Sequence, residues 1–340
     1  MRKTILGKTG LEVSAVGFGG IPIMRVSERD AVKAIHRALD VGVTFIDTAA
    51  CYGDSQTKIG AAIHDHRDGL VIATKSGAVS KDTILADIQQ SRRQLQTDFI
   101  DLYQLHGVSQ GAWETISGPD GALEGLLTAK QAGDIAHIGF TCHCVETAKK
   151  LARNDLFETV QFPYNLVARE PGDELIPIAR EHNMGFIVMK PMCGGQFDDA
   201  ELAFKFLNAF PDLVAIPGIE RPEEIEQIAA IVESGNTLTG EEAARADEIV
   251  KRLGKRFCRR CGYCQPCPQE IPITSALIFE SFVKRMPPEN VIGMAQNLIE
   301  KIPQCLECGK CVEKCPYDLP IPELLKEQIE VVRQFLAEST

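Results

Sequence analysis

The chain has 340 residues, of which 44% are hydrophobic and 24% charged, and its formal net charge is -11 at pH 7. No apolar run approaches the ~20 residues that a membrane-spanning helix requires, and the negative charge disfavours nonspecific binding of nucleic acids. We therefore expect a soluble protein with no membrane and no nucleic-acid partner, built from one large α/β domain and a smaller appendage.

Residues 1–13 place Gly7 and Gly10 between short apolar stretches, which predicts a two-stranded hairpin. We expect this hairpin to close the floor of the domain that follows. The same segment lacks the apolar stretch of a secretory signal, so we expect the protein to be cytoplasmic.

From residue 13 onward, short β-branched apolar runs alternate with longer segments of helical periodicity. The expected strands are residues 14–20, 43–47, 70–75, 101–106, 136–141, 159–163, 185–190 and 213–218. The expected helices are residues 27–42, 55–65, 81–96, 121–133, 144–154, 173–183, 199–210 and 221–235. This alternation is typical of an α/β fold, the (β/α)8 TIM barrel, which we assign to residues 1–240. A doubly wound open sheet is the alternative, although no G-x-G-x-x-G motif follows the first strand.

Four ionisable residues stand at or just after the ends of the second, third and fourth expected strands: Asp47, Tyr52, Lys75 and His106. The active site of such a barrel forms at the C-terminal ends of its strands. Tyrosine has a pKa of about 10 and exchanges protons poorly near neutrality unless a cation such as Lys75 stabilises its phenolate. Asp47 can hold the lysine, and His106 can orient a substrate oxygen. The set predicts proton delivery to a carbonyl that receives hydride, although each residue alone could be structural.

The segments DTAACYG, ATK and LH, in this order and on these strands, resemble the Asp-Tyr-Lys-His tetrad of the aldo/keto reductases. The resemblance covers residues 1–235. It implies a nicotinamide cofactor, NADPH or NADH, bound across the barrel mouth without a Rossmann fold, and a small-molecule carbonyl substrate. Tyr52 is then the catalytic acid, Lys75 and Asp47 tune it, and His106 orients the substrate.

The same resemblance implies cofactor contacts along the rest of the barrel. The segment GFTCHC stands where the family has G-x-S-N, so Thr141 and Cys142 take the places of the serine and the asparagine. The loop MKPMCGG stands where the family wraps the pyrophosphate. The cofactor-binding residues implied in this way are Gly20, Asp47, Thr141, Cys142, Gln161, Lys190, Pro191, Met192, Gly194, Pro217, Gly218 and Arg221.

The choice between NADPH and NADH stays open. Family members that prefer NADP usually have a lysine after the segment IP and an arginine six residues later, where this chain has Gly218 and Glu224. A carboxylate repels the 2′-phosphate, so NADH is as plausible as NADPH unless Arg221 takes over the clamp.

The triplet Cys142-His143-Cys144 could be taken for a metal site. Alternating side chains on one loop point apart, however, and so cannot converge on a metal ion. We therefore expect ordinary loop packing here.

Eight of the 12 cysteines lie in two motifs, CRRCGYCQPCP at residues 258–268 and CLECGKCVEKCP at residues 305–316. In a cytoplasmic chain such thiols indicate metal binding and not disulfides. The second motif has the C-x2-C-x2-C-x3-C-P spacing of a four-iron ferredoxin site, whereas the first has one residue fewer before its last cysteine. Zinc is the alternative, but a tetrahedral site has no use for the closely spaced third cysteine.

Two segments of helical periodicity, residues 273–286 and 289–302, separate the cysteine motifs. The arrangement resembles the all-α ferredoxin-like domain carried at the C-terminus by one branch of the aldo/keto reductases, and we assign it to residues 241–340. In two-cluster ferredoxins the fourth cysteine of each motif binds the other cluster. The resemblance thus implies two [4Fe-4S] clusters, one held by Cys258, Cys261, Cys264 and Cys315 and the other by Cys305, Cys308, Cys311 and Cys267.

Three functions are compatible with these features. The first is reduction of an aldehyde, ketone or sugar-like carbonyl by NAD(P)H, or the reverse reaction. The second is electron transfer between NAD(P)H and a redox protein at the iron-sulfur domain, which would need a flavin because hydride carries two electrons and a cluster one. The basic run KRFCRR at residues 255–260 is either a docking face for such a partner or a solvated face. The third is a nucleotide-sensing scaffold, which has no use for a proton donor.

Overall fold

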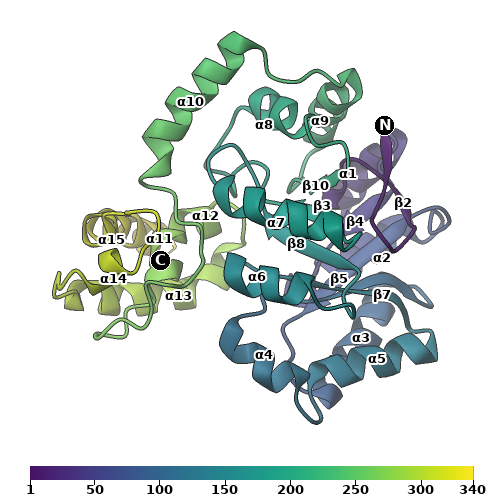
Figure 1. Cartoon of the computed structure of the whole chain (residues 1–340), viewed down its shortest axis with the longest axis horizontal. Coiled ribbons are helices and arrows are strands. Elements are labelled where there is room, and N and C mark those ends of the chain that lie inside the picture. The colour runs from purple at the N-terminus through teal and green to yellow at the C-terminus, as the bar shows by residue number, and fades with distance from the viewer. Residues whose placement is uncertain (340) are drawn as a thin grey trace.

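Eight parallel strands form the centre of the computed structural model, which describes residues 1–339 (Figure 1). They pair side by side in chain order. The bridges Val16–Ala215 and Gly19–Gly218 join the first strand to the last, so the sheet closes on itself. The strands are β3 (Phe18–Gly19), β4 (Phe45–Asp47), β5 (Val71–Ser76), β6 (Ile100–Leu105), β7 (Ile135–Thr141), β8 (Thr159–Pro163), β9 (Gly185–Met189) and β10 (Leu213–Ile216). The predicted (β/α)8 barrel is confirmed.

Helices between the strands cover the outside of the barrel (Figure 1). The eight predicted helices are present with shifted ends, and α4 is an additional helix that the sequence analysis did not anticipate. The helices are α1 (Glu28–Asp40), α2 (Ser55–Ile63), α3 (Lys81–Leu95), α4 (Gln110–Ser117), α5 (Ala122–Ala132), α6 (Val145–Ala152), α7 (Glu170–Glu181), α8 (Ala200–Leu207) and α9 (Pro222–Ser234). A short 3-10 helix, η1 (Pro22–Arg25), follows β3.

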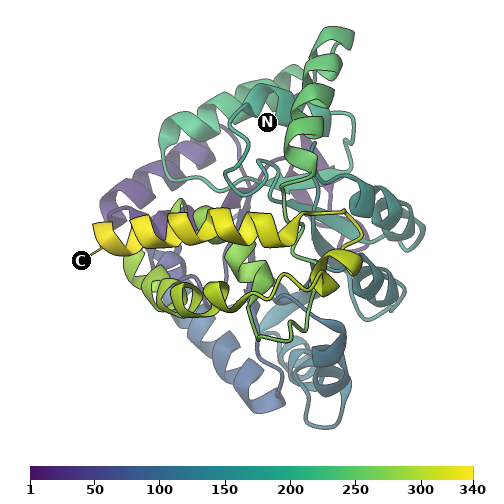
Figure 2. The same ribbon diagram turned by 90° about the vertical axis from the view of Figure 1, so that its left-hand side faces the viewer.

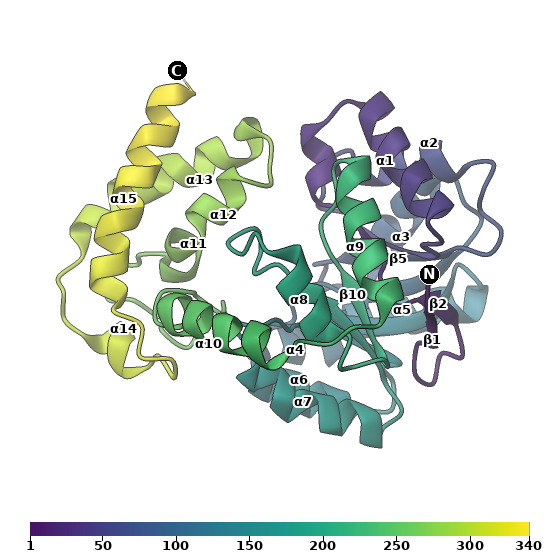
Figure 3. The same cartoon turned by 90° about the horizontal axis from the view of Figure 1, so that it is seen from above.

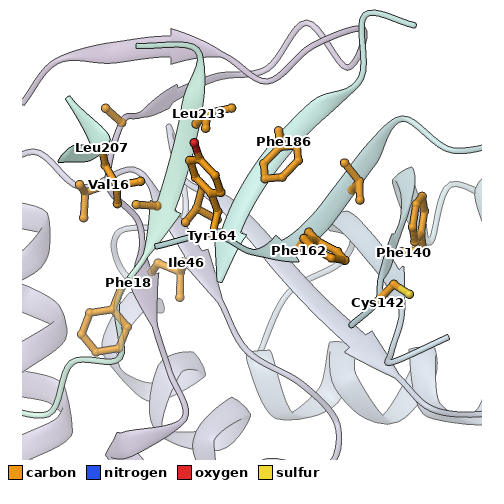
Figure 4. Close-up of a cluster of buried hydrophobic side chains, with 14 of the residues drawn as sticks. Val16, Phe18, Ile46, Phe140, Cys142, Phe162, Tyr164, Phe186, Leu207 and Leu213 are labelled. Atoms are coloured by element: carbon orange, nitrogen blue, oxygen red, sulfur yellow. The ribbon is translucent and has the colours of Figure 1, made fainter. Parts of the chain in front are cut away.

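Apolar side chains line both faces of the barrel strands. A large cluster fills the space between strands and helices, and Figure 4 shows part of it, including Phe162 and Phe186. A second cluster, with Phe45, Leu102 and Val214, fills the barrel interior. Burial on both faces is the rule for parallel strands covered by helices, and it explains why the strands read as continuous apolar runs.

The predicted hairpin closes the N-terminal end of the barrel. Strands β1 (Lys3–Ile5) and β2 (Glu12–Ser14) pair antiparallel, and Leu6 joins the interior cluster. Gly7 has a φ of +51°, and a Cβ there would lie 2.2 Å from the backbone nitrogen of Gly185. Only glycine fits this approach, because any side chain would collide with the β9 backbone. The floor is sealed, which leaves the C-terminal ends of the strands as the accessible mouth.

A helical region follows the barrel. Helix α10 (Gly240–Gly254) leads from the barrel toward it (Figure 3), and the helices after α10 pack around a separate apolar core. Figure 2 looks onto this region and shows α15 running across it. Its helices are α11 (Ile273–Leu277), α12 (Phe279–Val283), α13 (Pro288–Lys301), α14 (Lys310–Glu313) and α15 (Ile321–Glu338), with the 3-10 helix η2 (Ile302–Gln304).

Two features of the helical region differ from expectation. The segment 273–286 is two helices, because Ile278 leaves the helical conformation between α11 and α12. The run KRFCRR is not one solvated face, since Arg259 is buried and its guanidinium lies 4.1 Å from the centre of the Tyr317 ring. Arg260 lies 5.3 Å from the centre of the Phe282 ring, whereas the third arginine of the run, Arg256, is exposed. Within residues 1–339, no helix combines the length and apolar character needed to cross a membrane.

Candidate active site and cysteine pockets

The four residues predicted as catalytic lie together at the barrel mouth. Asp47 ends β4 and Lys75 lies near the end of β5. Lys75 Nζ donates to Asp47 Oδ1 at 2.6 Å and to the Thr48 carbonyl at 2.7 Å, and it lies 5.2 Å from the centre of the Tyr52 ring. The rings of Tyr52 and His106 meet edge to face, with centroids 5.9 Å apart.

Burial and the ion pair set the protonation of this group. Burial alone would lower the pKa of Lys75, but the adjacent Asp47 carboxylate outweighs it and raises that pKa. Burial also raises the pKa of Tyr52, although the Lys75 ammonium acts in the opposite direction. Tyr52 is therefore a protonated phenol at neutral pH, which is the form that can donate a proton.

His106 is a neutral imidazole in this setting. Burial first, and then the positive charges of Lys75, Arg260 and Lys190, lower its pKa to about 3. Its Nδ1 lies 3.6 Å from Cys51 Sγ. A neutral ring can donate one hydrogen bond to a substrate oxygen without adding charge to the pocket.

A pocket of about 420 Å³ opens above these residues, a size within the usual range of small-molecule sites. All four predicted catalytic residues line it. Most of the predicted cofactor-binding residues line it as well, namely Gly20, Asp47, Gln161, Lys190, Pro191, Met192, Gly194, Pro217 and Gly218. The barrel mouth therefore collects the side chains that the sequence assigned to catalysis and cofactor binding.

Three predicted cofactor residues lie outside the pocket lining. Thr141 Oγ1 accepts a hydrogen bond from the Gly107 amide at 2.7 Å. Cys142 is buried in the apolar cluster of Figure 4. Arg221 is exposed at the start of α9 and pairs with Glu224 at 2.9 Å, whereas Glu224 itself lines the pocket.

His143 is a pocket residue that the sequence analysis treated as loop packing. Its Nε2 lies 2.6 Å from Lys190 Nζ. Burial, and then the charges of Arg260 and Arg285, lower the pKa of Lys190 well below its usual range. No motif distinguishes this histidine, because only the fold shows that its side chain turns toward the mouth while Cys142 turns away.

The helical region forms the roof of the pocket. Residues of this region line the pocket opposite the barrel strands, among them Arg260, and Phe282 and Arg285 near the end of α12. The sequence contained Arg260 in a basic run, but nothing in it revealed that the helical region folds over the barrel mouth. The candidate active-site pocket is therefore shared between two parts of the chain.

Several side-chain contacts tie this roof to the barrel, including two that involve loops of the pocket. Ser281 on α12 donates to the Gly194 carbonyl at 2.5 Å, and Cys144 Sγ lies 3.1 Å from the Tyr263 hydroxyl. Both involve barrel loops at the C-terminal ends of strands. The roof is thus anchored on the loops that form the pocket.

The eight cysteines of the two motifs line two separate pockets in the helical region. One pocket is lined by Cys258, Cys261, Cys264 and Cys315. The other is lined by Cys267, Cys305, Cys308 and Cys311, with Cys264 at its edge. Each pocket combines three cysteines of one motif with the last cysteine of the other, which is the crossed arrangement implied by the ferredoxin resemblance.

This arrangement fits clusters better than single ions. Among residues 1–339, no three His, Cys, Asp or Glu side chains converge closely enough to hold one metal ion. In a [4Fe-4S] cluster each cysteine binds a different iron, so four thiols must surround a volume and not a point. The donor set of four cysteines per pocket suits such a cluster.

A nicotinamide also fits the barrel half of the pocket. Gln161 lines the mouth, and its Oε1 accepts from Gln104 Nε2 at 2.9 Å. Gln104 Oε1 is buried and has no hydrogen-bond partner within residues 1–339. The glycines of the pocket expose backbone along the loops after β9 and β10, where a dinucleotide can approach closely.

Residues 15–206 match the sequence profile of the aldo/keto reductase family, and residues 257–320 match that of the 4Fe-4S dicluster domain. The chain belongs to the aldo/keto reductase family. The predicted family, and its combination with a C-terminal 4Fe-4S dicluster domain, are confirmed.

Individual aldo/keto reductases agree with this assignment. The chain is 30% identical to aldo-keto reductase YhdN of Bacillus subtilis over 215 residues, which are 57% of this chain and 63% of YhdN. A structure of an aldo-keto reductase from Klebsiella pneumoniae in complex with NADPH matches with a TM-score of 0.63 and 25% identity, over 74% of this chain and 95% of that one. The holo form of AKR11C1 from Bacillus halodurans matches with a TM-score of 0.65 and 24% identity, over 73% and 96% of the two chains.

Proposed function

We propose that the protein reduces an aldehyde, ketone or sugar-like carbonyl with NADPH or NADH, or catalyses the reverse oxidation. The observation that carries this proposal is the protonated phenol of Tyr52 in a pocket backed by the buried Lys75–Asp47 ion pair. A proton donor held beside a buried cation is the arrangement that carbonyl reduction requires.

The bound nicotinamide would supply a hydride to the carbonyl carbon. Tyr52 gives its phenolic proton to the carbonyl oxygen as the C–O double bond becomes a single bond, so the product is an alcohol. Lys75 stabilises the phenolate that remains, and Asp47 keeps Lys75 charged at 2.6 Å. His106 donates to the same oxygen and fixes its position between the two donors.

Cofactor binding would use the rest of the barrel mouth. Gln161 suits the carboxamide, and the loop that includes Lys190 and Gly194 suits the pyrophosphate. At the other end Glu220 and Glu224 line the pocket near Gly218. Carboxylates accept hydrogen bonds from ribose hydroxyls and repel a 2′-phosphate, so the pocket suits NADH at least as well as NADPH.

The test is a Tyr52→Phe variant assayed under anaerobic conditions against a panel of aldehydes and ketones. We expect kcat to fall about 10²- to 10⁴-fold because the proton donor is lost, while the Kd for NAD(P)H stays the same. Tyr103→Phe is the matched control, since Tyr103 lies on β6 and is buried in the apolar cluster between the strands and the helices. Carbonyl turnover by Tyr52→Phe at the wild-type rate would refute the proposal.

A second candidate function, electron transfer to a protein partner, is favoured by one observation. In the pocket of Cys267, Cys305, Cys308 and Cys311, Cys308 is exposed, and the neighbouring Leu306 is an apolar side chain with 67% of its surface accessible. An exposed apolar side chain beside a cluster suits a docking contact. Bound clusters would supply one-electron transfer, and a cytoplasmic location would keep their thiols available.

Electron paramagnetic resonance separates the two functions. NADH or NADPH is added anaerobically to the iron-loaded protein, with and without free flavin. Reduced clusters in the absence of a carbonyl would support electron transfer. Fully oxidised clusters under both conditions would refute electron transfer from NAD(P)H and leave the clusters structural or reduced by a partner.

A further inference from the structure

We propose that Arg260 and Arg285, both contributed by the iron-sulfur domain, form an anion site beside the catalytic tyrosine, so that the substrates are carbonyl compounds carrying a carboxylate or phosphate. This inference rests on the proposed carbonyl reduction and narrows it to a substrate class. It assigns the helical roof a part in substrate recognition that is independent of electron transfer.

The two guanidinium groups lie near the same aromatic ring in the pocket roof. They lie 5.3 Å (Arg260) and 6.0 Å (Arg285) from the centre of the Phe282 ring. Arg285 Nε donates to the Ser281 carbonyl at 2.8 Å, which leaves its two terminal nitrogens available. Arg260 takes a left-handed backbone conformation with a φ of +65°, which is costly for a residue with a side chain.

The cations of this pocket outnumber the carboxylates that could balance them. Asp47 pairs with Lys75, and Glu220 pairs with Arg25 at 3.0 Å. Glu224, the remaining pocket carboxylate, pairs with Arg221 at 2.9 Å. Every carboxylate that lines the pocket therefore already has a cation partner.

In the described part of the chain, no carboxylate pairs with the two arginines of the roof or with Lys190 on the loop that faces them. Within residues 1–339, no carboxylate lies within 4.0 Å of the side-chain nitrogens of Arg260, Arg285 or Lys190. Partly buried cations that no carboxylate balances are costly, and their mutual repulsion adds to the cost. A bound anion would offset both costs, and the guanidinium fork suits a carboxylate or phosphate because it can donate two parallel hydrogen bonds.

The position of Arg260 favours a substrate anion, because Arg260 lines the same pocket as Tyr52 and His106. The cofactor pyrophosphate is the second possible source of an anion, because Arg285 also lies near Gly194, about 3.7 Å from the place where a Cβ would stand. The experiment below distinguishes the two sources.

The test compares matched substrates that differ only in charge, such as succinic semialdehyde with butanal, and glyceraldehyde 3-phosphate with glyceraldehyde. For Arg260→Gln and Arg285→Gln we expect kcat/KM with the anionic member of each pair to fall about 10- to 100-fold, mainly through KM. With the neutral member, kcat/KM should change less than about threefold, and so should the Kd for NADH and NADPH.

Two controls are needed because Arg260 lies in sequence between two cysteines that would bind a cluster, so that its replacement could disturb iron binding. Arg256→Gln removes an exposed arginine that pairs with Glu327 in the same region, and it should leave the charge preference unchanged. Iron content and the visible absorption spectrum must match the wild type in every variant. Arg285→Gln lies away from the cysteine motifs, so it tests the site even if Arg260→Gln loses iron.

Three results would overturn the inference. Equal losses with charged and neutral substrates would show that the arginines are not a charge-specific site, and a parallel loss of NAD(P)H affinity would assign them to the pyrophosphate. If no carbonyl is turned over, the proposed reduction fails, but calorimetry with succinate and inorganic phosphate in the presence of NADH still tests the site. Failure of the wild type to bind either anion would then reject the site by itself.

Discussion

The barrel wall and the helical roof of the pocket differ in how their charges are compensated. On the wall, Lys75 and Asp47 form an ion pair at 2.6 Å. On the roof, Arg260 and Arg285 face the same pocket without a carboxylate partner in the described chain. The charges of the Lys75–Asp47 pair on the wall balance each other, whereas the two arginines of the roof have no carboxylate to balance them within residues 1–339.

The apolar cores repeat this contrast. The barrel has an interior cluster, sealed by Leu6, and an extensive outer cluster. The helical region has a smaller core, and several of its cysteines pack at the edge of that core. A small domain of this kind usually depends on metal ligation for much of its stability. The comparison indicates a self-sufficient barrel and a lid whose order depends on what it binds.

Removal of iron should give the largest effect. A helical region that stayed ordered without iron would contradict the contrast with the barrel. After chelation under reducing conditions, we expect amide hydrogens of residues 258–339 to exchange rapidly, because four thiols per pocket lose the group that joins them. Amides of the barrel strands should keep their protection. Hydrogen exchange followed by mass spectrometry measures both parts in one sample.

A single cysteine variant sharpens this result. Cys311→Ser should lower the iron content and loosen the helical region, whereas Cys51→Ser, which alters an exposed thiol at the barrel mouth, should not. If the helical region stays protected without iron, its apolar core alone is sufficient, and the contrast with the barrel is wrong.

Replacement of Lys75 tests the claim that the wall depends on its internal pair. Lys75→Met leaves Asp47 buried without a cation, so we expect the free energy of unfolding of the barrel to fall by about 3–5 kcal/mol. Lys81→Met is the control, since the Lys81–Glu124 pair lies at the surface and water replaces it easily. Urea unfolding followed by circular dichroism gives both values. Equal stabilities of the two variants would contradict a structural role for the buried pair.

The sequence was sufficient to predict the barrel and to predict that the four residues of the tetrad lie together at its mouth. Eight apolar runs with helices between them fix the closed sheet, and the ends of parallel strands meet at one edge. Asp47 and Lys75 therefore had to converge whatever the loops did. The crossed cysteine pockets could also be predicted from the sequence. The spacing within each motif is local, and a general rule of two-cluster ferredoxins pairs the last cysteine of each motif with the other cluster.

The roof could not be predicted in this way. The distance in sequence between His143 and Arg285 is long, and no periodic pattern records that α12 lies over the barrel mouth. Cys142 and His143 show the related difficulty within a loop, where one residue of shift decides between the apolar cluster and the pocket. Loop conformation depends on backbone angles that composition does not determine.

The pH dependence of stability should reveal the neutral histidine of the wall. His106 has a pKa of about 3 in the folded protein and about 6.5 when unfolded, so the unfolded chain binds the extra proton between these values. Stability should therefore fall as pH decreases from about 6.5 toward 3, by up to about 1.4 kcal/mol per pH unit for this group. His106→Gln should flatten that slope in urea titrations. An unchanged slope would mean that His106 is protonated in the folded pocket.

The cofactor preference should show the smallest effect, at the end of the pocket where both carboxylates are paired. Glu224 Oε2 accepts from the backbone amides of Glu220 and Arg221, so Glu224→Gln keeps an acceptor for the helix terminus and removes only the charge. We expect the KM for NADPH to fall a few-fold and the KM for NADH to change little, because repulsion of the 2′-phosphate is lost at a solvent-screened site. Initial rates with each cofactor measure the ratio. A larger change for NADH would place the carboxylate on the ribose hydroxyl and not near a phosphate.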